Sequence, residues 1–308
     1  MTNQTPLSDR VTPDHLRSDA QALAAGFPDL LAQADQLAAT ISLGTHGRRR
    51  AGPGDEFWQY RPASPGDNMR DIDWRRSART DAQTDGYFVR QMEWQNLQAV
   101  HMWVDGGASM DFASADNLPT KGHRAKILAL ATAILLGRAG ESFGLMSDPA
   151  PPRSGRGQVT KLALRLADSA DAAGGSDYGH VPQKELARGN RALFVSDFLG
   201  DWSSVVDALA QAADQRVEGC LVQVLDPVEE SFPFDGRTIF ESMQGSLSFE
   251  TRRAKALRDD YLDRLADRKA QLADLAKRTG WMFTTHHTDQ PAQSALLWIH
   301  AALAGATL

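Results

Sequence analysis

Hydrophobic positions in the last two thirds of the chain alternate between the period of strands and the period of helices. Short apolar runs predict strands over residues 97–104, 141–146, 191–195, 219–225 and 281–285. Helical spacing separates them, over residues 121–138, 158–169, 203–215, 253–278 and 291–303. Strands separated by helix-length segments indicate a parallel sheet with helices on both faces. The sequence therefore predicts an α/β fold with a doubly wound, mainly parallel sheet, interrupted by a hairpin over residues 237–249.

The first third of the chain follows a different pattern. Residues 27–41 place apolar side chains at helical spacing, and residues 87–94 alternate apolar and polar side chains as a half-buried strand does. Between them, residues 47–79 carry 13 charges in 33 residues, together with Phe57, Trp58, Tyr60 and Trp74. Such a segment cannot form an ordinary core element, and the aromatic side chains indicate an ordered surface structure. We predict an N-terminal helical and irregular region, partly β, over residues 1–94, and the α/β domain over residues 95–308.

Composition narrows the classes of function. The net charge of −6 argues against general binding to nucleic acid or to an anionic membrane surface, because both favour a basic protein. The longest apolar run, residues 127–136, is about half of the roughly 20 residues that a spanning helix needs. The N-terminus lacks the pattern of a signal peptide, and Cys220 is the single cysteine. These features predict a cytoplasmic protein without membrane insertion and without a disulfide.

Three predicted strands end in an acidic residue, namely Asp105, Asp197 and Asp226. In an open α/β sheet the functional crevice lies at the carboxyl ends of the strands, so these side chains should lie near one another. Carboxylate and hydroxyl oxygens are ligands for hard cations such as Mg²⁺, and the turn after Asp105 also carries Ser109. The alternative is that these residues only cap helices and form turns, which Asp and Ser commonly do.

Two sets of residues resemble known families. A strand followed by Asp105-x-x-x-Ser109, and a later strand ending in Ser196-Asp197, resemble the von Willebrand factor type A fold. The charged stretch is similar to the family known as domain of unknown function 58, DUF58. The similarity rests on Gly47-Arg48-Arg49-Arg50, Gly54-Asp55-Glu56-Phe57, Tyr60-Arg61-Pro62, Pro65-Gly66-Asp67, Arg70-Asp71-Ile72-Asp73-Trp74 and Ser77-Ala78-Arg79-Thr80. It extends from about residue 44 to the C-terminus.

The resemblance implies a metal-ion-dependent adhesion site, for which Mg²⁺ is the candidate ion. Asp105 and Ser109 match the first and last residues of its Asp-x-Ser-x-Ser motif, and Asp197 matches the later acid. Thr160 is the candidate for the threonine ligand by its order in the chain. Gly107 stands where the motif has its first serine, so the site is degenerate and lacks one hydroxyl.

The resemblance also implies partners, because DUF58 proteins are often associated with MoxR-type AAA+ ATPases. We therefore expect a non-catalytic adaptor or chaperone-like protein that helps to assemble or activate a client protein complex. Arginines of the charged stretch are the candidate partner-binding residues, with pairing to nearby acids as the alternative: Arg48, Arg49, Arg50, Arg75, Arg76 and Arg79. Binding of nucleic acid through Arg48 to Arg50 is the least favoured function.

The sequence offers no assembled set of catalytic residues. It has no G-x-S-x-G turn, and the turn after Asp105 lacks the second aspartate, two residues further on, that a phosphoaspartate hydrolase would need. We therefore predict that the protein is not an enzyme. The alternative is a metal-dependent hydrolase or phosphatase that uses Asp105 and Asp197.

Overall fold

The computed structural model describes residues 30–41, 50–51, 57–64, 69, 72–77, 87–94, 99–172, 176–243, 245 and 248–305. The chain forms two compact units. One contains residues 1–43 and 99–308, and the other contains residues 44–98.

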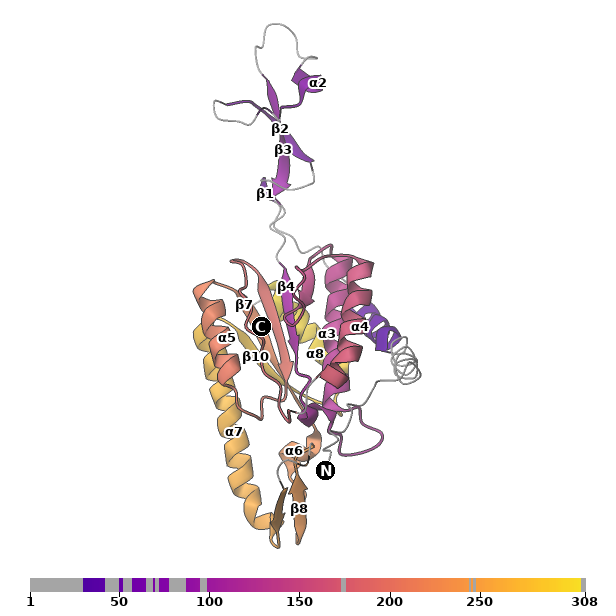
Figure 1. Ribbon diagram of the computed structural model, residues 1–308, viewed down its shortest axis with the longest axis vertical. Helices are drawn as coiled ribbons and strands as arrows, with labels where there is room; N and C mark the ends of the chain where they lie inside the picture. Colours follow the sequence, from indigo (N-terminus) through magenta and orange to yellow (C-terminus); the bar gives the residue numbers. More distant parts are fainter. Residues whose placement is uncertain are drawn as a thin grey trace, which may run out of the picture. The chain divides into compact units, whose positions relative to one another are not determined.

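The larger unit is built on a five-stranded sheet in which every strand is parallel to its neighbours (Figure 1). Its strands are β4 (Val100–Val104), β5 (Phe143–Leu145), β6 (Arg191–Ser196), β7 (Glu218–Leu225) and β10 (Met282–His287). Their order across the sheet is β10-β7-β6-β4-β5. Numbered along the chain this is 2-1-3-4-5, the order of a doubly wound sheet whose direction of winding reverses between β4 and β6. The predicted α/β class and parallel sheet are confirmed.

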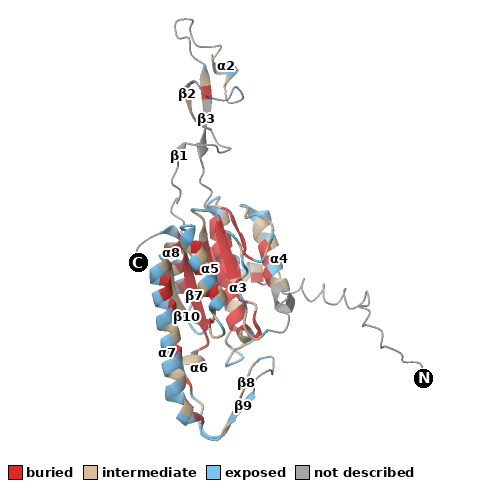
Figure 2. Ribbon diagram, turned by 60° about the vertical axis from the view of Figure 1, so that its left-hand side comes forward, coloured by how far each residue is buried: buried red, intermediate tan, exposed pale blue. Residues whose placement is uncertain are grey.

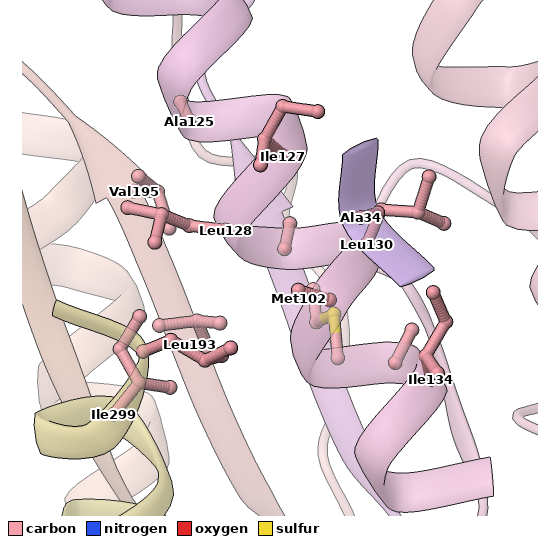
Figure 3. Close-up of a cluster of buried hydrophobic side chains, with 14 of the residues drawn as sticks. Ala34, Met102, Ala125, Ile127, Leu128, Leu130, Ile134, Leu193, Val195 and Ile299 are labelled. Atoms are coloured by element: carbon pink, nitrogen blue, oxygen red, sulfur yellow. The ribbon is translucent and has the colours of Figure 1, made fainter. Parts of the chain in front are cut away.

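One face of the sheet is covered by α3 (Lys121–Arg138), α4 (Arg156–Ala172) and α8 (Ala292–Ala304). Figure 3 shows Met102, Leu193 and Val195 of the strands turned toward this layer of helices. Residues 127–136 of α3, the longest apolar run of the sequence, are all buried. A helix that is apolar on every side belongs in the core of a protein of this size, and α3 lies there.

The N-terminal helix, residues 30–39, belongs to this same core. Leu30, Ala34, Leu37 and Ala38 are buried in it at the predicted helical spacing, and Ala34 lies close to Leu130 of α3 in Figure 3. The predicted division at residue 94 is therefore corrected in one respect. The helix is part of the α/β unit, because its apolar stripe is buried against α3, and only residues 44–98 form the separate unit.

The opposite face of the sheet packs against α5 (Ser203–Asp214) and α7 (Ala254–Thr279). Because side chains alternate along a strand, Ala192 and Phe194 of β6 face these helices while Leu193 and Val195 face α3. Figure 2 shows the sheet as a buried layer between helices whose outer sides are exposed. None of the described helices is both long and apolar enough to cross a membrane.

The predicted hairpin is formed by β8 (Thr238–Glu241) and β9 (Ser248–Thr251), and it lies at the far end of α7 (Figure 1). The short helix α6 (Pro227–Ser231) connects β7 to it. Phe232 anchors the base of the hairpin, because its ring stacks on Phe240 at a centroid distance of 5.7 Å and contacts Tyr261 of α7 at 4.9 Å. Ile239 and Phe249 remain more than half exposed.

The smaller unit contains a three-stranded antiparallel sheet in the order β1-β3-β2. Its strands are β1 (Arg50–Ala51), β2 (Phe57–Pro62) and β3 (Phe88–Trp94), and the one-turn helix α2 (Trp74–Ser77) precedes β3. Trp74 packs edge to face on Tyr87 at 5.4 Å, and the Tyr60 hydroxyl donates to Asp73 Oδ2 at 3.0 Å. Among the described residues of the charged stretch, the aromatic side chains of Tyr60 and Trp74 thus make specific contacts.

A buried histidine makes the fold sensitive to acid. His286 of β10 is 2% exposed, and Arg124 Nη1 lies 3.1 Å from its Nε2. A guanidinium group only donates, so Nε2 accepts and the ring is neutral. Burial, followed by the charge of Arg124, lowers the pKa of His286 from 6.5 to about 4, although Asp289 acts in the opposite direction. The unfolded chain therefore binds this proton at a higher pH than the folded protein does.

We expect stability to fall as the pH drops from about 6.5 toward 4. Between pH 7 and pH 5, His286 alone should reduce the free energy of unfolding by about 2 kcal/mol. Urea unfolding of the wild type and of His286→Gln at both pH values checks this, because glutamine can still accept from Arg124. Other groups titrate equally in both proteins, so parallel pH profiles would contradict the prediction.

Candidate functional site

The candidate site lies where β4, β6 and β7 end, at the point where the winding of the sheet reverses. Asp105 follows β4, Asp197 follows β6 and Asp226 follows β7. All three carboxyl groups are buried, with exposed fractions of 2%, 1% and 0%. The prediction that the strand-end acids gather at one edge of the sheet agrees with this topology, and each carboxyl group has its own set of partners.

Asp105 is held by its own turn and by the neighbouring strand. Its Oδ1 accepts from the amide of Gly107 at 2.7 Å, and its Oδ2 accepts from Ser196 Oγ at 2.5 Å. Burial, followed by the nearby charge of Asp197, raises the pKa of the Asp105 carboxyl group, whereas these hydrogen bonds lower it. Both oxygens are thus engaged within the protein.

Asp197 forms a buried ion pair with a lysine. Lys121, the first residue of α3, is 1% exposed, and its Nζ lies 2.8 Å from Asp197 Oδ2 and 2.6 Å from Glu229 Oε1. The ring of Phe112 lies 5.8 Å from the same nitrogen, within the range of a cation–π contact. Burial lowers the pKa of Lys121, but the two carboxylates outweigh burial and raise it overall. Lys121 is therefore a charged ammonium group enclosed by protein.

Glu229 reaches Lys121 because α6 begins with a capping box. Val228 N donates to Asp226 Oδ1 at 2.9 Å, and Asp226 N donates to Glu229 Oε2 at 2.8 Å. The other oxygen of Glu229 is then free to accept from Lys121. Asp226 Oδ2 accepts from the amide of Ser114, so Asp226 fastens α6 to the segment that precedes α3. Asp226 has the role of a helix cap, which was the alternative reading of the strand-end acids.

A loop over residues 176–179 covers the Asp105 turn. The amides of Ala108 and Ser109 donate to the carbonyls of Ser176 and Asp177 at 3.2 and 2.8 Å. A Cβ atom at position 107 would lie 2.5 Å from the amide nitrogen of Gly179, and one at position 179 would lie 2.1 Å from Asp105 Oδ1. Gly107 leaves room for the backbone of the covering loop, and Gly179 leaves room for the carboxyl group of Asp105. The covering loop thus occupies the space that a serine at position 107 would need.

Of the other two predicted metal ligands, one lies near Asp105 and one does not. Ser109 lies on the same turn as Asp105, and its Oγ is buried with no hydrogen-bond partner among the described residues. Thr160 is not part of the site. It is exposed on α4 and donates to the carbonyl of Arg156 in its own helix. The first turn of α4 is fastened to Phe143, which pairs with Val100 at the start of β4, the opposite end of the strand from Asp105.

Half of the six predicted partner-binding arginines fall outside the described residues. This holds for Arg48, Arg49 and Arg79. Arg50 lies in β1 and pairs in register with Trp94, and Arg75 and Arg76 lie in α2. Of these, Arg75 is seen to be exposed.

A comparison with known protein families shows to which family the chain belongs. The family described as "Protein of unknown function DUF58" matches residues 59–271, a range that begins within β2 of the smaller unit and includes all the acids of the site. The chain belongs to the DUF58 family. The resemblance in the charged stretch therefore identified the family correctly.

Relatives of this DUF58 protein occur in mycobacteria. An uncharacterized protein of Mycobacterium bovis is 29% identical over 294 residues, which cover 90% of this chain and 89% of the relative. Uncharacterized proteins of two Mycobacterium tuberculosis strains show the same identity and coverage. The similarity extends over nearly the whole length of both proteins.

Two solved structures from Bacteroides are more distantly similar. An aerotolerance-related membrane protein of Bacteroides fragilis matches at 14% identity with a TM-score of 0.42, covering 67% of this chain and 98% of that one. The conserved hypothetical protein BatB of Bacteroides thetaiotaomicron matches at 13% identity with a TM-score of 0.36, covering 68% and 98%. Because both scores are below 0.5, neither likeness supports a conclusion about function.

The side chains of this DUF58 protein do not fit the Mg²⁺ ion that the resemblance implies. Asp197 is already neutralised by Lys121, and both oxygens of Asp105 accept hydrogen bonds. The covering loop fills the position of the missing serine, and Thr160 lies elsewhere. Within the described part of the chain, no three His, Cys, Asp or Glu residues are arranged to hold a metal ion.

Sequence reasoning missed Lys121, Glu229 and the covering loop. A signal for Lys121 was present, because a lysine at the first position of a helix is disfavoured by the helix dipole unless acids compensate it. Glu229, three residues after Asp226, matches the spacing of a capping box. Tyr178 and Gly179 belong to a loop whose contact with Gly107 no local pattern reveals.

Proposed function

We propose that this DUF58 protein is a non-catalytic protein-interaction module with a von Willebrand factor type A-like fold. It would act as an adaptor or chaperone-like partner of a MoxR-type AAA+ ATPase in the assembly or activation of another protein complex. The association with this ATPase class comes from the family resemblance. The von Willebrand-like assignment is supported by Asp105 and Ser109 on one turn and by Asp197 at the end of the next strand across the sheet.

The observation that carries the proposal is that the carboxyl groups of Asp105 and Asp197 are buried and bonded to other groups of the protein. A catalytic carboxylate must reach the group on which it acts. Asp105 and Asp197 are 2% and 1% exposed, and each already has partners inside the protein. The geometry therefore does not favour the alternative of a metal-dependent hydrolase, which needs the same two side chains.

Two surfaces offer contacts to a protein partner. The smaller unit presents Arg75 and the half-exposed Trp74, and arginine and tryptophan are both enriched in protein interfaces. The hairpin of the larger unit presents Ile239, Met243 and Phe249, each about half exposed. Exposed apolar side chains gathered on one element are typical of contact sites.

Affinity purification tests the proposal. The full chain is used as bait in extracts of its native cells, with ATP and with ADP, and the bound proteins are identified by mass spectrometry. We expect a MoxR-type ATPase and the subunits of a client complex to be recovered. Recovery of neither would contradict the proposal, as would hydrolysis of phosphoester substrates with Mg²⁺ that Asp105→Ala abolishes.

Matched variants show which surface binds. Arg75→Glu changes the smaller unit, and Arg188→Glu makes the same change of charge at an exposed loop of the larger unit. We expect Arg75→Glu to reduce recovery of the ATPase at least about tenfold, the effect of losing one interface hot spot, and Arg188→Glu to have no effect. Equal losses in both variants would contradict a specific role for the charged stretch.

A further inference from the structure

We propose that the ammonium group of Lys121 is a built-in cation that occupies the cation site at the carboxyl ends of β6 and β7. The protein therefore needs no divalent ion there, and removal of the side chain should create a site for one. This inference concerns the folded chain alone and does not depend on which partner it binds.

The surroundings of Lys121 are those of a bound cation. Two carboxylate oxygens lie 2.8 and 2.6 Å from Nζ, and the face of the Phe112 ring lies on a further side. The two acids come from separate elements, because Asp197 follows β6 and Glu229 belongs to α6. Lys121 thus links the start of α3 to the end of β6 and to α6. A bound metal ion would link the same elements in the same way.

The position of Lys121 in its helix supports a specific role. It is the first residue of α3, where the helix dipole repels a positive charge. Enclosure within the protein adds a desolvation cost to that repulsion. Both costs are offset by the two carboxylates, together with the contact to the Phe112 ring. A lysine that served packing alone could be replaced by an apolar residue without either cost.

The distances indicate which ion would replace the ammonium group. Oxygen ligands lie about 2.3–2.6 Å from Ca²⁺ and about 2.0–2.1 Å from Mg²⁺. At 2.6 and 2.8 Å from Nζ, the two carboxylate oxygens lie nearer to the Ca²⁺ distances than to the Mg²⁺ distances. When Lys121 is shortened to alanine, the vacated volume has Asp197 and Glu229 on its walls and room for water. We therefore expect that variant to bind Ca²⁺ in preference to Mg²⁺.

Thermal unfolding of the full chain tests this in chelator, in Ca²⁺ and in Mg²⁺. The wild type should have the same melting temperature in all three. Above its dissociation constant, Ca²⁺ should raise the melting temperature of Lys121→Ala by about 3 °C for each tenfold increase in concentration. Lys121→Met, whose side chain fills the volume of the lysine stem, should respond much less.

A second variant keeps the test decisive if Lys121→Ala does not fold in chelator. Ca²⁺ should then restore its far-ultraviolet circular dichroism, and the double variant Lys121→Ala/Asp197→Asn, which lacks one charged ligand, should not be restored. Stabilisation of the wild type by either ion would overturn the proposal. So would a Lys121→Ala protein that neither melts later nor refolds with Ca²⁺.

Discussion

Replacement of Lys121 by methionine is expected to reduce the free energy of unfolding by about 3–5 kcal/mol, the cost of removing one partner from a buried ion pair. Methionine keeps most of the apolar stem and deletes the charge. Asp197 and the nearly buried Glu229 would then face each other without a cation. Domains are commonly stable by about 5–15 kcal/mol, so the variant should still fold. Equilibrium unfolding in urea measures the difference.

Lys161→Met is the matched control for this experiment. Lys161 also lies on a helix and pairs with an aspartate, since its Nζ is 2.7 Å from Asp148 Oδ2, but its side chain is 40% exposed. Asp148 is 10% exposed, but an ion pair whose lysine reaches solvent contributes about 0–1 kcal/mol, so the control should be close to the wild type. If Lys121→Met cost no more than Lys161→Met, the buried ammonium would not stabilise the site.

Restoring the serine of the adhesion motif should damage the protein. Gly107→Ser is expected to cost about 3 kcal/mol, the upper part of the usual range for overpacking. The reason is that its Cβ would lie 2.5–2.8 Å from backbone atoms of Tyr178 and Gly179. Backbone atoms yield less than the end of a flexible side chain. Because the clash begins at Cβ, Gly107→Ala should cost about as much, as urea unfolding would show.

Gly157→Ser serves as the control, because Gly157 is exposed in α4 and nothing lies within 4 Å of a Cβ placed there. Its stability should change by less than about 0.5 kcal/mol. The backbone of Gly107 itself, with φ −61° and ψ 152°, suits any residue, so contact alone requires glycine. A Gly107→Ser protein as stable as the wild type, and stabilised further by Mg²⁺, would show that the covering loop moves aside for an ion.

Much of the fold could be predicted from the sequence because the sheet is buried on both faces. The apolar runs around Leu193 and Val222 have the length of strands, and the run over residues 127–136 has the length of a helix. Length therefore assigns each run to one kind of element. The helix over residues 30–39 was also predicted, but its assignment to a separate N-terminal region was not correct. Amphipathic spacing shows that a face is buried and does not show which unit buries it.

The site was predictable only in part. The positions of Asp105 and Asp197 at one edge of the sheet could be predicted, because parallel strands place their carboxyl ends together. Thr160 was chosen by its order in the chain, and chain order does not fix the end of the sheet at which a helix begins. Lys121 was missed because its partners lie 76 and 108 residues away, beyond any local spacing.

The structure changes the interpretation of Gly107. In the sequence it appears as a lost ligand, which leaves a weakened metal site. In the folded protein it is the place where residues 178 and 179 press against the Asp105 turn. The missing serine, the buried lysine and the covering loop therefore belong to one arrangement, a cation site completed and closed by the chain itself.

Nitrogen-15 spectroscopy of the lysine side chains tests this arrangement most directly. The ammonium group of Lys121 should give a signal that exchanges slowly with water, because the group is 1% exposed and hydrogen-bonded to two carboxylates. The signal should be absent from Lys121→Met and should persist at a pH at which surface lysines lose their proton, since the two carboxylates raise the pKa of Lys121 despite its burial. Millimolar Ca²⁺ or Mg²⁺ should leave it unchanged. Absence of a slowly exchanging ammonium signal in the wild type, or its loss when a divalent ion is added, would contradict the account.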